Sequence, residues 1–116
     1  MGVQTLSSDV RGFLYGLFSQ ASNIFQYKAT QLGPAEAQEA RGLSFEFMRA
    51  QGMARRGGDE ASISAAIDGL VAKVNGLTDP GLKDAAEELR DWQKLYFRHV
   101  KPQERTDLGS YGNGIF

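Results

Sequence analysis

Few residues in this chain have the types and spacing that chemistry at a protein site requires. His99 is the single histidine and there is no cysteine, which excludes histidine-based metal clusters, histidine relays and thiolate chemistry. Carboxylates are plentiful, but pairs such as Glu36 and Glu39 have the spacing of neighbours on a helix surface. The Glu-x-x-His motif of di-metal bundles is absent, and no glycine-rich loop follows a strand. We therefore expect a protein that is not an enzyme and that holds no metal or cofactor.

A basic stripe marks the last part of the chain that has helical spacing. The side chains of Arg90, Lys94 and Arg98 follow at steps of four, which places them on one helix face, and Lys101 comes next. Such a stripe can contact phosphates or an acidic protein surface. Ordinary helix electrostatics is the favoured alternative, because acidic residues begin this helix and form pairs such as Glu87–Arg90 with the bases that end it.

Four amphipathic helices are expected to position these residues. Apolar side chains recur at steps of three and four over residues 8–32, 34–54, 59–75 and 79–100, and serine, proline, aspartate and glycine stand at the boundaries. The second stripe, which includes Phe47 and Met48, is less regular than the others. Short connections favour antiparallel neighbours, and no segment alternates as a strand does. The predicted fold is all-α, an up-and-down bundle of about four helices with an irregular, glycine-rich C-terminal arm.

The predicted bundle domain covers residues 1–102, and residues 103–116 form an extended tail. Three closely spaced glycines argue against a stable helix in the tail, since each costs about 1 kcal/mol there. Yet the tail carries apolar side chains that a merely solvated segment would lack: Tyr111, Ile115 and Phe116. Two interpretations stay open. The tail is an arm that docks into a neighbouring subunit or partner, or it folds back on its own bundle.

The first predicted helix has no charged residue between Gly12 and Tyr27. Opposite its apolar stripe, small uncharged residues share one face at spacings of four, three and four: Gly12, Gly16, Ser19 and Asn23. An exposed helix face normally carries lysine and glutamate. One interpretation, which at least equals the other in weight, is that the first helix is the central helix of its own bundle, so that neighbouring helices of the same bundle cover this face; the other is that a subunit contact covers it.

Together these features favour a structural or adaptor subunit of a larger protein assembly, of the virion, phage or secretion type. Its partners would be other copies of itself or neighbouring subunits, bound through the first helix and the C-terminal arm. The alternative is a small regulatory or inhibitory protein that acts on a partner protein through the basic stripe. Nucleic acid is a less favoured partner, since the formal net charge is -1. No membrane span and no signal peptide are expected, which suggests the cytoplasm or a virus-like particle as the location.

Overall fold

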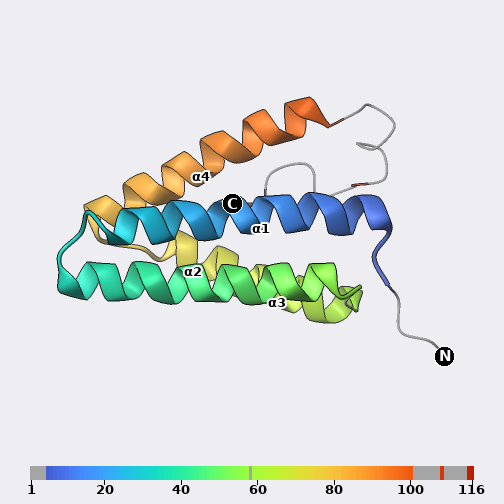
Figure 1. The fold of residues 1–116 in the computed structure, drawn as a ribbon, viewed down its shortest axis with the longest axis horizontal. Helices are drawn as coiled ribbons and strands as arrows, with labels where there is room; N and C mark the ends of the chain where they lie inside the picture. The colour runs from blue at the N-terminus through green and yellow to red at the C-terminus, as the bar shows by residue number, and fades with distance from the viewer. Residues whose placement is uncertain (1–4, 58, 101–107, 109–114) are drawn as a thin grey trace.

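A computed structural model describes residues 5–57, 59–100, 108 and 115–116 of the chain. Four helices account for most of them, and they run alternately up and down (Figure 1). Their bounds are α1 (Ser8–Ala29), α2 (Pro34–Arg55), α3 (Glu60–Asn75) and α4 (Pro80–His99). The predicted all-α bundle of four helices is confirmed. Residues 109–114, which hold the glycines of the predicted arm, lie outside the described residues, so the proposed boundary between residues 102 and 103 stays a prediction.

The ends of the helices follow from local capping chemistry. Ser7 begins α1 by accepting a hydrogen bond from the Val10 backbone N–H, and Asp79 accepts one from the Gly81 N–H at the start of α4. The first helix ends at Ala29, three residues earlier than expected. Its last turn closes there because the backbone N–H and the hydroxyl of Thr30 both donate to the Tyr27 carbonyl.

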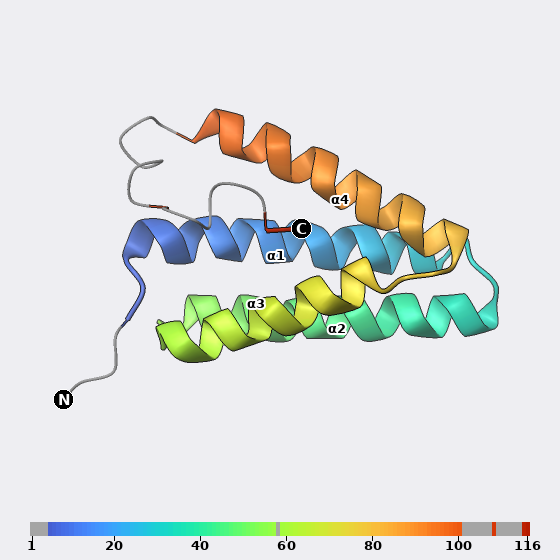
Figure 2. The same cartoon turned by 180° about the vertical axis from the view of Figure 1, so that it is seen from behind.

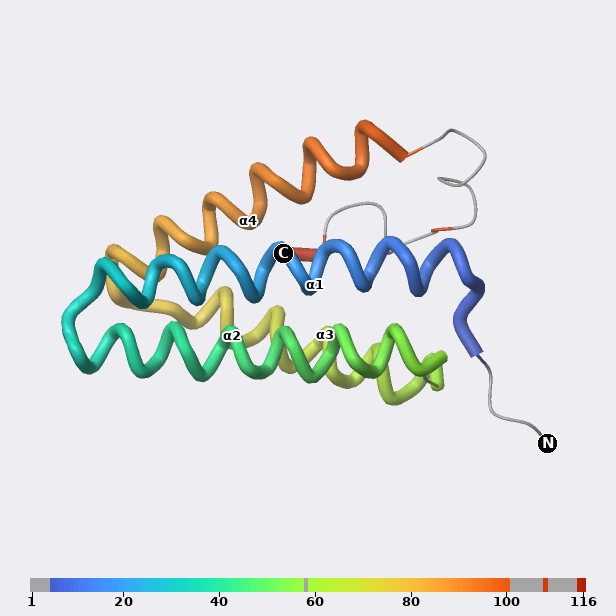
Figure 3. Tube along the Cα trace, in the orientation of Figure 1, coloured from blue at the N-terminus to red at the C-terminus, as the bar shows by residue number. Residues whose placement is uncertain are grey.

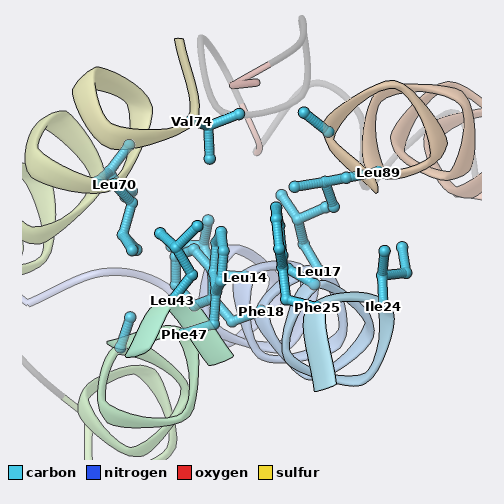
Figure 4. Close-up of a cluster of buried hydrophobic side chains, with 14 of the residues drawn as sticks. Leu14, Leu17, Phe18, Ile24, Phe25, Leu43, Phe47, Leu70, Val74 and Leu89 are labelled. Atoms are coloured by element: carbon cyan, nitrogen blue, oxygen red, sulfur yellow. The ribbon is translucent and has the colours of Figure 1, made fainter. Parts of the chain in front are cut away.

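The two long helices α1 and α2 form the centre of the molecule. The buried side chains of Ser22 and Ser44 form a hydrogen bond of 3.0 Å between them. Aromatic rings pack on the inner side of this pair, with the Phe25 and Phe47 rings stacked at 5.8 Å. Apolar side chains from all four helices converge on the same core (Figure 4).

The shorter helices cover this central pair on different sides. The main partner of α3 is α2, and the main partner of α4 is α1. Figure 1 shows α1 and α2 in front of α3, and the reversed view in Figure 2 shows α3 in front of α2. The tube in Figure 3 shows that α2 and α4 lie on opposite sides of α1. None of the four helices therefore covers one broad face of the α1–α2 pair.

Asp59 gives the fold a measurable response to pH. Its carboxylate accepts a hydrogen bond of 2.9 Å from the Ser62 hydroxyl and further bonds from the backbone N–H groups of Ala61 and Ser62. The Ser62 hydroxyl above all lowers the pKa of Asp59. Because the pKa is lower in the folded state, the carboxylate stabilises the fold above the pKa of the unfolded chain, and this stabilisation is lost as pH falls.

We therefore expect Asp59→Ala to destabilise the chain at about pH 6 and to matter much less at about pH 3. Urea unfolding of the two proteins across that interval measures the difference in free energy of unfolding. A difference that stays constant over the whole interval would contradict the role given to the ionised carboxylate.

Candidate protein interface

In the ranges 5–57 and 59–100 with residues 108, 115 and 116, no three His, Cys, Asp or Glu side chains gather as metal ligands would. No described helix has the length and apolar character needed to cross a membrane. A hollow of about 350 Å³ lies between α2 and α3, and the exposed ion pair of Lys73 and Glu46 stands at its edge. An exposed pair of this kind is typical of solvated helix surfaces.

The four residues of the predicted contact face of α1 differ in how far the bundle buries them. Gly16 lies under α4, since a methyl group placed on it would come within 2.5 Å of the Tyr96 hydroxyl oxygen. At this position the small residue allows α4 to pack closely on α1. Ser19 is half-buried, while Gly12 and Asn23 are exposed. A subunit contact through these three residues stays a prediction.

The last two residues pack against the chain's own bundle. The Gln93 side-chain oxygen accepts hydrogen bonds from the backbone N–H groups of Ile115 and Phe116, at 2.9 and 3.1 Å. The Phe116 ring meets the Phe47 ring edge-on at 5.4 Å. Within one copy, Ile115 and Phe116 therefore lie against their own bundle, as the fold-back interpretation describes. Their contact with a neighbouring subunit stays a prediction, and Tyr111 lies outside the described residues.

The same packing engages Arg90, the first residue of the basic stripe of α4. The Arg90 Nε donates to the Phe116 carbonyl at 2.6 Å, and its guanidinium also contacts Asn75 and Glu87. The Glu87–Arg90 pair is the one that helix electrostatics predicted. Lys94 and Arg98 are exposed, and Lys101 falls outside the residues that the structure describes. An anionic partner on this stripe stays a prediction, now without a free Arg90.

A different surface, which the sequence pattern did not predict, lies on the uncovered side of α2. Five residues follow at steps of four, three, four and three, so they share one helix face: Arg41, Phe45, Met48, Gly52 and Arg55. We name this set the α2 outer stripe. The side chain of Phe45 is 66% exposed and that of Met48 is 40% exposed. The expectation that Met48 belongs to the apolar core stripe is wrong, because a step of one residue from the buried Phe47 turns it away from the core.

The charges around the α2 outer stripe are of one sign. Arg41 and Arg55 are exposed, and neither has an ion-pair partner within the described part of the chain. The carboxylates of Glu39 and Glu46 line the hollow on the α3 side of the helix instead. From α1, the exposed Tyr15 lies beside Arg55 at a shallow depression. Aromatic, methionine and arginine side chains without carboxylates are the composition typical of the centre of a protein interface.

The described residues thus define the class of the molecule as a four-helix, all-α protein with one uncovered face that has the composition of a protein interface. Comparison with protein-family models, with curated proteins and with solved structures found no match.

Proposed function

We propose that this chain is a non-enzymatic structural or adaptor subunit that binds protein surfaces through the α2 outer stripe and the uncharged face of α1 beside it. The observation that carries the proposal is the exposed pair Phe45 and Met48, flanked by arginines without ion-pair partners among the described residues. Clusters of this kind on a soluble protein mark interaction sites more often than isolated apolar side chains do.

The energetics favour a role in association. Burying a phenylalanine or methionine side chain that is otherwise exposed contributes roughly 1.5–3 kcal/mol each. Arginine and aromatic side chains are also the residues most often found at the energetic centre of interfaces. Two neighbouring side chains of this kind on one rigid helix can therefore supply the apolar centre of a contact between subunits, to which the surrounding residues add.

The setting of the proposal is an assembly of the virion, phage or secretion type, in the cytoplasm or in a virus-like particle. The main competing proposal is a small inhibitor that acts on one partner as a monomer. The mass measured in solution separates the two proposals. Copies of an assembly subunit associate as their concentration rises, so the average mass increases, whereas an inhibitor stays monomeric. The contacts of Arg90 within its own bundle weaken the version of the inhibitor that uses the basic stripe.

Replacing Phe45 and Met48 together by alanine should weaken self-association at least about tenfold, since it removes the apolar centre of the stripe. Light scattering over a range of protein concentrations measures the effect. Asp68→Ala is the control, because Asp68 is also exposed but lies on α3, away from both proposed binding surfaces. A wild-type chain that stays monomeric at every concentration, or equal effects in variant and control, would refute the proposal.

A further inference from the structure

The outward face of α4 carries a second patterned surface. Its acidic side chains and one leucine follow at steps of four, three and four: Asp84, Glu88, Asp91 and Leu95. We name this set the α4 acidic stripe. All four side chains are exposed, and Leu95 is 54% exposed. The opposite face of the helix is buried in the core through residues such as Leu82 and Leu89, so the acidic stripe faces away from the bundle.

Within the described part of the chain, the carboxylates of this stripe form no ion pair. Among the residues that the structure describes, the only α4 carboxylate in an ion pair is Glu87, which contacts Arg90 and does not belong to the stripe. Asp84, Glu88 and Asp91 are therefore three exposed negative charges without a basic partner in the described ranges. The Leu95 side chain adds an exposed apolar group at the end of the row.

The two stripes match in charge and spacing over the acidic half of the α4 face, up to Leu95; three residues further on, the same face carries the exposed Arg98. On α2, the apolar Met48 stands seven residues from Arg41 and seven from Arg55. On α4, the apolar Leu95 stands seven residues from Glu88. Seven residues of helix span about 10.5 Å. When Leu95 packs on Met48, an arginine therefore comes opposite Glu88 whether the two helices lie parallel or antiparallel.

Within one copy the stripes do not face each other, because α2 and α4 both turn their buried faces to the common core and each stripe lies on the side of its helix that faces away from it. The two surfaces are different patches, so a contact between them joins copies head to tail. Contacts of this kind close into rings or continue as filaments, unlike the self-matched contact of a two-fold dimer.

We propose that the α2 outer stripe of one copy docks on the α4 acidic stripe of the next copy. This inference rests on the proposed function and names its partner, a second copy of this chain. Arg41 or Arg55 pairs with Glu88 and its acidic neighbours, while Phe45 and Met48 pack on Leu95. Opposite charges at the rim set the orientation, and the apolar side chains supply the attraction at the centre.

Complementary charge reversal in the full-length chain tests the docking. One variant carries Arg41→Glu and Arg55→Glu, and the other carries Glu88→Lys and Asp91→Lys. All four positions are exposed, so both variants should fold as the wild type does, which circular dichroism checks. Each variant alone should associate at least about tenfold more weakly than the wild type, by light scattering. Added salt should also weaken the wild-type association, because it screens the charges at the rim.

Mixing the two variants distinguishes this docking from a general effect of charge. Each variant keeps the stripe that the other has lost, and the reversed stripes are again opposite in sign, so the equimolar mixture should regain the mass of the wild-type assembly. Asp68→Lys, which reverses an exposed carboxylate of α3, is the control and should leave association unchanged. A mixture that stays monomeric would overturn the inference. If substitution of Phe45 and Met48 abolishes association but reversal of Glu88 and Asp91 does not, the inferred docking on α4 is overturned while the proposed function stays intact.

Discussion

Replacing Phe47 by alanine should lower the free energy of unfolding by about 3–5 kcal/mol. The Phe47 side chain is fully buried, and its ring contacts the rings of Phe18, Phe25 and Phe116 at centroid distances of 6.4, 5.8 and 5.4 Å. These partners come from α1 and from the end of the chain. Truncation therefore opens a cavity where three segments meet, and rigid helices on both sides limit how far it can collapse. Urea denaturation followed by circular dichroism measures the loss.

Phe45→Ala is the matched control for this prediction. Phe45 has the same side chain on the same helix, two residues away, but it is exposed to solvent. Two residues along a helix correspond to a rotation of about 200°, so the two rings point in nearly opposite directions. The control should change the free energy of unfolding by no more than about 0.5 kcal/mol. Equal losses in the two variants would contradict the division of α2 into a core face and an outer stripe.

The helices and most of the core could be predicted from the sequence, because both depend on local patterns. Apolar residues at steps of three and four define each buried face, and Asp59 and Asp79 accept backbone hydrogen bonds where capping residues were expected. The error at Met48 has a physical cause. An apolar residue beside a buried phenylalanine fits the pattern, but the side of α2 that is covered depends on where α1 packs, as the buried Ser22–Ser44 contact shows.

Contacts between segments far apart in the chain could not be predicted in the same way. Gly16 lies against Tyr96 because α4 crosses α1 there, and spacing within either helix does not specify where helices cross. Gln93 is buried although it is polar, and the hydrogen-bond donors that explain its burial lie 22 and 23 residues later in the chain. The α2 outer stripe was missed for a related reason, since exposure depends on which face the other helices leave uncovered.

The end of the chain contributes to the stability of the fold, and deleting Ile115 and Phe116 should lower the free energy of unfolding by about 2–4 kcal/mol. The deletion removes the half-buried ring of Phe116, which packs against the ring of Phe47. It also leaves the Gln93 side-chain oxygen without the two backbone donors that it has in the folded chain, although Gln93 is only 6% exposed. A buried acceptor that has lost its donors keeps the cost of its desolvation. Thermal and urea unfolding of the truncated chain measure the loss.

A double-mutant cycle shows whether Gln93 acts through the end of the chain. In the full-length chain, Gln93→Ala should cost about 1–3 kcal/mol, because it leaves the N–H groups of Ile115 and Phe116 without their acceptor. In the truncated chain those donors are already gone, so the same substitution should cost at least about 1 kcal/mol less. Glu88→Ala, on the exposed face of α4, is the control and should have the same small effect in both backgrounds. If the costs of Gln93→Ala and of the truncation simply add, the end of the chain does not dock on Gln93 in solution, and the arm that reaches a neighbouring subunit becomes the better description of residues 115–116.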